Sequence, residues 1–230
     1  MDVQKLMMLI LLAPGAILAI SLHEAMHGYV ANRLGDPTAK LLGRLTLNPF
    51  KHIDIFGTIL VPAFLFYTTG LLFGWAKPVP VNPMNLRRPR QDMAWVATAG
   101  PGANLVLGLV ASALLYLLIP IIKLPMSERI MSTVVVPFVL ILLFMLKFNI
   151  MLMLFNLLPI PPLDGGRIIV GVLPERQARV YGAIEPFGFF ILIGLLLLDR
   201  QIPILSYTLF PVMDLLMKIL LPSYVLNLGV

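Results

Sequence analysis

Residues 93–122 read MAWVATAGPGANLVLGLVASALLYLLIPII, thirty residues without one Asp, Glu, Lys, Arg or His. As an α-helix this stretch would be about 45 Å long, more than enough to cross the roughly 30 Å hydrocarbon core of a bilayer. The whole chain shares this bias, since 59% of its 230 residues are hydrophobic and 12% are charged, whereas soluble domains carry about 25% charged residues. The sequence therefore predicts an integral membrane protein.

Further apolar stretches indicate how often the chain crosses the membrane. They are Leu6–Leu22, Val134–Leu158, Ile184–Leu198, Ile202–Leu221 and, interrupted by Pro62 and Gly70, Ile53–Phe73. The first leads directly into His23, so we expect it to be retained and not cleaved as a signal peptide. We expect an all-α polytopic membrane protein with about five full transmembrane helices plus a re-entrant or partly embedded segment. Residues 1–230 would then form a single membrane-embedded domain, because no stretch is left for a separate soluble one.

A polar motif, His23-Glu24-Ala25-Met26-His27, ends the first apolar stretch. A helix turns once in 3.6 residues, so His23 and His27 share one face and can present two imidazole nitrogens to a single zinc ion. Glu24 lies beside them and can take a proton from zinc-bound water. Two histidines at this spacing could instead pair with polar neighbours. Ionisable groups are costly in lipid, however, and there they mark functional sites, so we predict a metal site.

A catalytic zinc usually has three protein ligands, so a third must come from elsewhere in the chain. There is no Cys, which excludes thiolate ligands, and the only other histidine is His52. The second candidate is Asp164, within NLLPIPPLDGG at residues 156–166. The prolines cannot continue a regular helix and Gly165 and Gly166 let the backbone turn, so the carboxylate can swing inward. Asp164 could also cap the following helix, but beside a histidine pair we favour ligation.

Three segments taken in order, HEAMH, TAGPGAN at residues 98–104 and Asn156–Gly165, resemble the site-2 protease family of intramembrane zinc metalloproteases. The resemblance covers most of the chain and implies one Zn²⁺ per chain, bound by His23, His27 and Asp164. It also implies that Glu24 is the catalytic base and that Asn156 helps to hold the substrate or the oxyanion. The chain looks like a short form of the family, without the PDZ or CBS domains attached to some relatives.

The two zinc-binding segments must reach the same depth, and this constrains the topology. Each lies at the exit end of its span, so the first span and Val134–Leu158 must run parallel, with an odd number of crossings between them. Ile53–Phe73 and Met93–Ile122 therefore cannot both cross, and the charges indicate that Ile53–Phe73 is the one that does not cross fully. Basic residues flank it on both sides, namely Arg33, Lys40, Arg44 and Lys51 before it and Lys77, Arg87, Arg88 and Arg90 after it. Since positive loops stay in the cytoplasm, we predict a multi-pass protein of a prokaryotic cytoplasmic membrane, with its active site toward the cytoplasmic side.

The proline-rich segment Trp75–Pro83 is predicted to be stiff and extended. If it forms a short β element, Lys77, Val79 and Val81 would direct their N–H groups toward one edge, where an unwound substrate could pair by strand addition. A rigid connector is the alternative interpretation.

These features predict a zinc metalloendopeptidase that hydrolyses peptide bonds within or near transmembrane segments, and the resemblance implies a role in regulated intramembrane proteolysis. The expected partners are a transmembrane protein or peptide substrate and the lipid bilayer, with no particular oligomeric state predicted. The net charge of +6 is spread over short loops and so indicates membrane orientation, not nucleic-acid binding. A divalent-metal transporter and an inactive binding member of the same fold are the alternatives.

Overall fold

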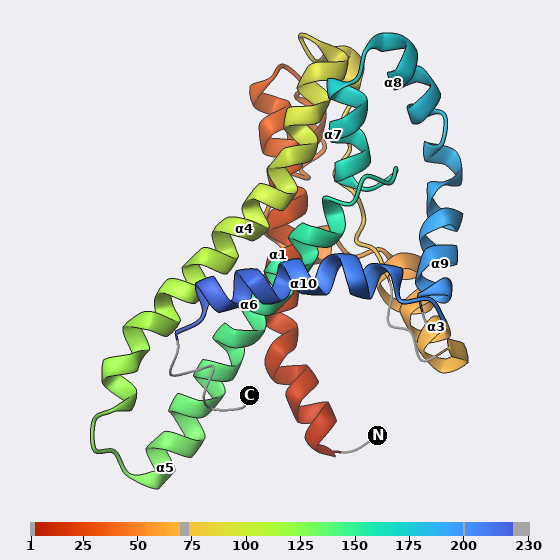
Figure 1. The fold of residues 1–230 in the computed structure, drawn as a ribbon. Coiled ribbons are helices and arrows are strands. Elements are labelled where there is room, and N and C mark those ends of the chain that lie inside the picture. The colour runs from red at the N-terminus through yellow and green to blue at the C-terminus, as the bar shows by residue number, and fades with distance from the viewer. Residues whose placement is uncertain (1–2, 70–73, 200, 223–230) are drawn as a thin grey trace.

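The computed structural model describes residues 3–69, 74–199 and 201–222, which form helices and loops without a β-strand. The longer helices are α1 (Val3–Arg33), α3 (Val61–Thr69), α4 (Pro89–Ile122), α6 (Val136–Asn156), α7 (Asp164–Val172), α8 (Glu175–Gly182), α9 (Gly188–Leu198) and α10 (Ile204–Leu220) (Figure 1). The shorter ones are α2 (Thr38–Leu41), α5 (Glu128–Ile130), the 3₁₀ turns η1 (Pro49–Lys51), η3 (Pro83–Asn85) and η5 (Glu185–Phe187), and the π-helical turns η2 (Ile55–Leu60) and η4 (Met131–Val135). The predicted all-α class is confirmed for the described residues.

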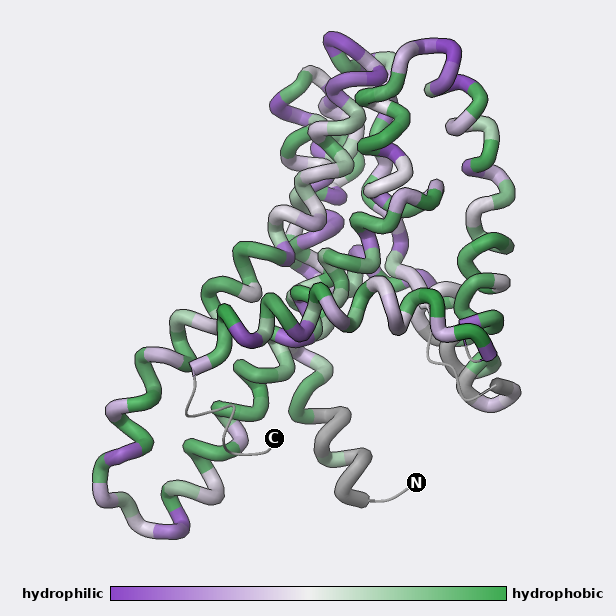
Figure 2. The backbone as a smooth tube through the Cα atoms, in the orientation of Figure 1, coloured by the Kyte–Doolittle hydropathy of each residue, from purple (hydrophilic) through white to green (hydrophobic). Residues whose placement is uncertain are grey.

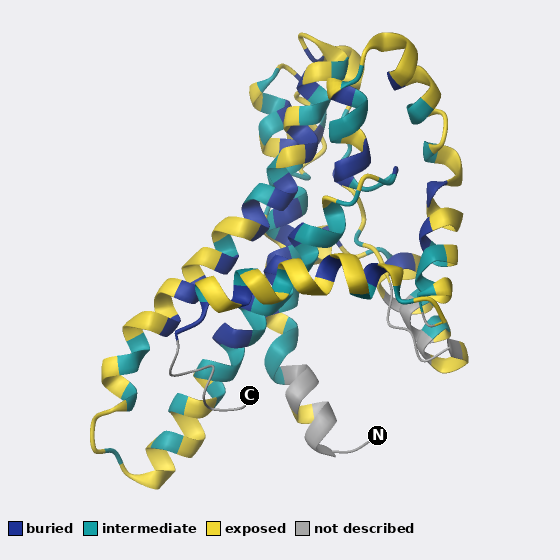
Figure 3. Cartoon of the chain, in the orientation of Figure 1, coloured by how far each residue is buried: buried dark blue, intermediate teal, exposed yellow. Residues whose placement is uncertain are grey.

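Helices α1, α4 and α6 form the centre of the molecule, and α7 packs against α4 (Figure 1). Much of the contact between α4 and α6 is an apolar cluster that contains Ala111, Leu115, Leu142, Leu143, Leu146, Ile150 and Met153. Gly108 lets these two helices approach closely, because an added Cβ would lie 3.2 Å from Cδ1 of Ile150. Figure 3 shows buried residues where the central helices meet and exposed residues on their outer faces. Exposed apolar faces are what a protein surrounded by lipid requires.

Three helical segments are long and apolar enough to cross a membrane: Pro89–Ile122, Glu128–Asn156 and Glu175–Leu198. Figure 2 shows their hydrophobic lengths between more hydrophilic ends. They coincide with three of the predicted spans, Met93–Ile122, Val134–Leu158 and Ile184–Leu198, and are candidate spans by length and composition. Helices α1, with 31 residues, and α10, with 17, occupy the other two predicted stretches, and their crossing stays a prediction.

The stretch predicted to be re-entrant forms η2 and α3, which together run from residue 55 to residue 69. At 1.5 Å per residue this is about 22 Å, shorter than the hydrocarbon core. Residues 70–73 of the predicted segment lie outside the described residues. Whether the whole segment crosses the bilayer stays a prediction.

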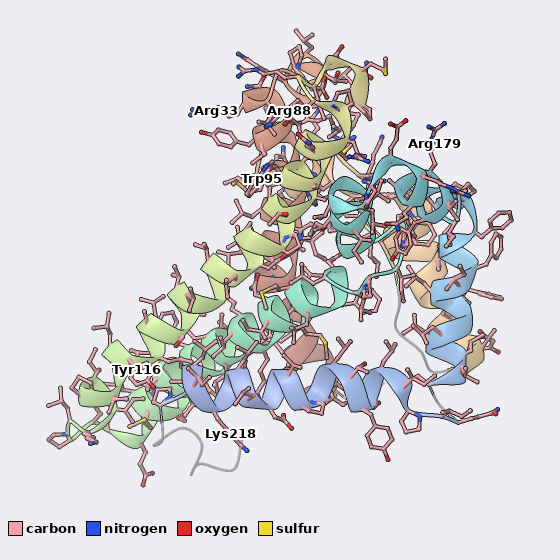
Figure 4. All side chains as sticks on the ribbon, turned by 45° about the horizontal axis from the view of Figure 1, so that its top comes forward. Arg33, Arg88, Trp95, Tyr116, Arg179 and Lys218 are labelled. Atoms are coloured by element: carbon pink, nitrogen blue, oxygen red, sulfur yellow. The ribbon has the colours of Figure 1, made fainter. Side chains whose placement is uncertain are left out.

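The end of α1 and the beginning of α4 lie at the same end of the molecule, where Arg33 and Arg88 are labelled in Figure 4. Gly35 follows α1, and an added Cβ there would lie 3.0 Å from the carbonyl oxygen of Asn85. This proximity agrees with the predicted placement of both basic clusters on one side of the membrane. That this side is the cytoplasm stays a prediction.

Candidate metal centre

His23 and His27 meet Asp164 from another part of the fold, because α7 packs on α4 and brings its first residue to α1. The two Nε2 atoms are 3.1 Å apart. Oδ2 of Asp164 lies 3.2 Å from Nε2 of His23 and 3.4 Å from Nε2 of His27. Among the described residues this is the one group of three or more His, Asp or Glu side chains close enough to hold a metal ion.

The outer ring nitrogen of each histidine is already hydrogen-bonded. Nδ1 of His27 lies 2.7 Å from the carbonyl oxygen of Val96, and Nδ1 of His23 lies 2.5 Å from Oδ1 of Asn104. A carbonyl or amide oxygen only accepts, so each Nδ1 carries the proton and donates it. Both Nε2 atoms then keep their lone pairs, as metal ligands must.

The three converging atoms fit a zinc ion. Two Nε2 lone pairs and a carboxylate oxygen face one another with no proton between them, and the buried Oδ2 of Asp164 has no hydrogen-bond partner. Without a cation these groups would repel each other. In a tetrahedral zinc site with bonds of about 2.0–2.1 Å, neighbouring ligand atoms lie about 3.3 Å apart. The distances of 3.1, 3.2 and 3.4 Å match this spacing and leave a fourth position open.

Gly100 of α4 gives the histidine pair its space. An added Cβ would collide with Nε2 of His27 and would lie 2.6 Å from Nε2 of His23. Any larger residue would therefore fill the place where the ligand atoms converge. In the sequence, Gly100 stands out only as part of the TAGPGAN segment. Gly100 is four residues before Asn104, the only asparagine of Met93–Ile122, and so lies on the same face of the helix. This spacing was the available signal that the face meets polar groups.

Glu24 is held by the segment between α3 and α4. The backbone N–H of Val79 donates to Oε2 of Glu24 at 2.9 Å. Val79 itself is buried against Gly28, where an added Cβ would lie 2.8 Å from Cγ1 of Val79. One carboxylate oxygen of Glu24 is therefore fixed by a backbone donor.

A model of peptidase family M50 matches residues 11–198. The chain belongs to peptidase family M50. The "Putative zinc metalloprotease YwhC" of Bacillus subtilis is 40% identical over 198 residues, which cover 86% of this chain and 83% of that protein. The "Putative zinc metalloprotease Rip2" of Mycolicibacterium smegmatis is 30% identical over 190 residues, which cover 82% of this chain and 67% of that protein. No significant match was found among solved structures.

Membership of M50 confirms the resemblance to site-2 proteases and makes the chain a zinc metalloprotease by family, with His23, His27 and Asp164 as its candidate metal site. His52, the other ligand considered, lies elsewhere in this M50 fold. It is buried, and its Nε2 donates to the carbonyl oxygen of Thr46 at 2.8 Å. The structure thus brings Asp164, and not His52, to the histidine pair.

Asn156 is the last residue of α6, and among the described residues no hydrogen bond joins its side chain to the candidate metal ligands. Its Nδ2 donates to the carbonyl oxygen of Leu152 in the same helix at 2.9 Å. Contact with a substrate therefore stays a proposal for this residue.

The glycines after Asp164 act differently from the expectation. Gly165 and Gly166 lie in the first turn of α7 and neither has a positive φ, a feature found at Gly35 and Gly43 among the described glycines. A Cβ at Gly165 would collide with the carbonyl oxygen of Leu157, and one at Gly166 with the backbone of Pro161. The prediction that they let the backbone turn was wrong. They let the proline-rich loop pack directly against α7 and so fix Asp164.

The segment Trp75–Pro83 also differs from the expectation of a free strand edge. The N–H of Lys77 donates to the carbonyl oxygen of His52 at 2.8 Å, and the N–H of Val79 is taken by Glu24. Arg44 contacts the carbonyl oxygens of Lys77 and Pro78 from its guanidinium. The segment is irregular, and two of the three donors proposed for strand addition are bonded within the chain.

The metal centre lies inside the apolar length of α4. Trp95 and Tyr116 are exposed on this helix, 63% and 47%, and lie toward its opposite ends in Figure 4. Their separation of 21 positions corresponds to about 32 Å, the thickness of a hydrocarbon core, and Trp and Tyr favour its two interfaces. Gly100, which contacts both histidines, lies five residues inward from Trp95, about 8 Å along the helix.

Proposed function

We propose that this M50 protein is an intramembrane endopeptidase, which uses one zinc ion to hydrolyse peptide bonds within or near transmembrane segments of other membrane proteins. His23, His27 and Asp164 would hold the metal, and Glu24 would be the catalytic base. The observation that supports this most is the depth of the candidate ligands, about 8 Å inward from Trp95 along α4. A substrate bond must reach that depth to be cleaved.

The chemistry divides between the metal and the protein. Bound zinc supplies Lewis acidity, which polarises the scissile carbonyl and makes a water molecule acidic near neutral pH. Glu24 accepts a proton from the attacking water as the new C–O bond forms, and passes it to the amine as the C–N bond breaks. Val79 orients the carboxylate of Glu24 through its backbone N–H, which donates to Oε2. Asn156, at the end of α6, is proposed to contact the substrate or the oxyanion.

The arginines at one end of the molecule suggest the orientation of the site in the membrane. Arg33, Arg88 and Arg179 lie toward the same end of the molecule as Trp95 (Figure 4). Gly100, which contacts both histidines, lies about 8 Å inward from Trp95 along α4. By the positive-inside rule we assign this end to the cytoplasmic side of a prokaryotic membrane. Substrates would then include membrane-anchored regulators that are released toward the cytoplasm.

The transporter alternative makes a different use of the same ligands. A transport path requires polar groups along the membrane and near its midplane, whereas the described residues provide one metal cluster at one depth. An inactive binding protein would have no use for a base held by a backbone donor, as Glu24 is.

Purified protein in liposomes with a single-span model substrate tests the proposal. We expect cleavage that stops when a chelator removes the metal and returns when Zn²⁺ is restored. Zinc flux into the liposomes without any cleavage would overturn the proposal in favour of a transporter.

A further inference from the structure

Two asparagines are completely buried between the central helices. Asn104 of α4 and Asn149 of α6 are each 0% exposed. Nδ2 of Asn104 donates to Oδ1 of Asn149 at 2.9 Å, and Oδ1 of Asn104 faces Nδ1 of His23. The two amides therefore form a chain that leads from α6 through α4 to a candidate metal ligand on α1.

The direction of every hydrogen bond in this chain follows from backbone groups that can only accept. Nδ2 of Asn149 donates to the carbonyl oxygen of Met145 at 2.8 Å, so its Oδ1 must point toward Asn104. Nδ2 of Asn104 then donates to Asn149 and lies 3.4 Å from the carbonyl oxygen of Ala19. With its NH₂ group so engaged, Asn104 can offer only its oxygen to His23.

We infer that Asn104 is a positioning residue, which with Asn149 holds His23 in the tautomer whose Nε2 lone pair faces Asp164 and His27. The inference rests on the proposed function, since it assigns these residues a role toward the metal. A flipped Asn104 would place an NH₂ group against Nδ1 of His23, which would shift the ring proton to Nε2 and block ligation there.

Packing alone does not call for these amides. One turn further along α4, Gly108 meets Ile150 of α6 through apolar contact. Ala111 of α4 and Leu146 of α6 belong to the same apolar cluster as Ile150. A buried amide is costly unless each polar atom is paired, and the atoms of Asn104 are paired with the ligand His23 and with Asn149. His27 needs no such residue because Val96 of α4 supplies a backbone carbonyl.

Zinc affinity of the purified full-length protein, measured by competition with a chromogenic chelator, tests the role without requiring cleavage. Asn104→Leu keeps a side chain of similar size but makes it apolar, so that it cannot accept from His23, and should weaken zinc binding about 10- to 100-fold. Asn104→Asp keeps an acceptor at His23 and should bind zinc at least ten times more tightly than Asn104→Leu. If Asn104 served only in packing, Asn104→Leu would be the more stable of the two variants, since a buried carboxylate is harder to accommodate than Leu. The two variants would then bind zinc equally well.

Asn149→Leu tests the second link of the chain and remains informative if Asn104→Leu does not fold. It should weaken zinc binding less than Asn104→Leu does, and should add nothing when Asn104 is already Leu, because Asn149 acts only through Asn104. The matched control is Ser112→Ala, which removes a buried hydrogen bond between α4 and the carbonyl oxygen of Leu220 far from the ligands. Its zinc affinity should equal that of the wild type.

Two results would count against the inference in different ways. If wild-type protein binds zinc and Asn104→Leu binds it equally well, the positioning role is wrong while the proposed function stands. If folded wild-type protein binds no zinc at the His23, His27 and Asp164 site, the proposed function fails and the inference fails with it.

Discussion

Replacing Gly100 by Ala places a methyl group where the candidate ligand atoms converge. The new Cβ would collide with Nε2 of His27 and lie 2.6 Å from Nε2 of His23, while ordinary contacts begin at about 3.4 Å. One or both imidazoles would have to move by roughly 0.8 Å. Zinc–ligand distances tolerate deviations of about 0.2 Å, so the site cannot absorb this movement.

We therefore expect Gly100→Ala to lose at least about 100-fold in zinc affinity, which corresponds to about 2.7 kcal/mol of binding free energy. Gly102→Ala is the matched control on the same helix, because an added Cβ there meets no atom within 4 Å. Ala in place of Gly in a helix stabilises by up to about 1 kcal/mol, so this variant should be at least as stable as the wild type and bind zinc equally well. Chelator competition and thermal unfolding of the purified proteins measure both quantities. Wild-type zinc affinity in folded Gly100→Ala would refute the geometry of the site.

Three further predictions concern the surroundings of the centre. Val79→Pro removes the N–H that donates to Glu24 and should lower kcat about tenfold or more, with zinc content unchanged. Val81→Pro in the same segment is the control and should leave kcat unchanged. An equal loss of kcat in both variants would show that Val79 does not position Glu24. Burial raises the pKa of the Asp36 carboxyl, but hydrogen bonds from Thr38, Asn85 and Asn82 outweigh it and hold the pKa below its ordinary 3.8. This contribution is present above the unfolded-state pKa and lost as pH falls through the lower folded-state value, so Asp36→Ala should cost about 2 kcal/mol at pH 6 and progressively less below pH 3.8 in thermal melts; a difference that does not shrink with acid would contradict this. Single cysteines replacing Arg33 and Arg88 should react with an impermeant thiol reagent from the same side of the membrane, and one replacing Lys123 at the other end of α4 from the opposite side; labelling of Arg33 and Arg88 positions from different sides would mean that Ile53–Phe73 crosses.

The residues that one helix brings together were predictable from the sequence. His23 and His27 share a face of α1 because of the helical period, and Asp164 could be placed beside them because a span ends just before it. The contacts between helices were not predictable in this way. Val79 is 55 positions from Glu24 and Asn104 is 81 positions from His23, and each pairing depends on how segments pack in three dimensions.

The glycines show the same division. The motifs that contain Gly100, Gly165 and Gly166 were visible in the sequence, but the role of these glycines was not. Each lets another part of the chain lie directly against its helix, the histidine pair at Gly100 and the proline-rich loop at the other two. A sequence pattern shows that a position holds a small residue, but it does not show which group of the folded protein lies against that residue.

The central claim is that Glu24 drives hydrolysis at the His23, His27 and Asp164 centre inside the membrane. The most direct measurement compares wild-type protein with Glu24→Gln in liposomes in ¹⁸O-labelled water, with mass spectrometry of the products from a single-span substrate and zinc content determined for both proteins. We expect a wild-type product whose new carboxyl terminus carries ¹⁸O and lies within or next to the transmembrane segment, and no product from Glu24→Gln despite about one zinc per chain. Equal cleavage by zinc-loaded Glu24→Gln, or cleavage confined to segments far from the membrane, would contradict it.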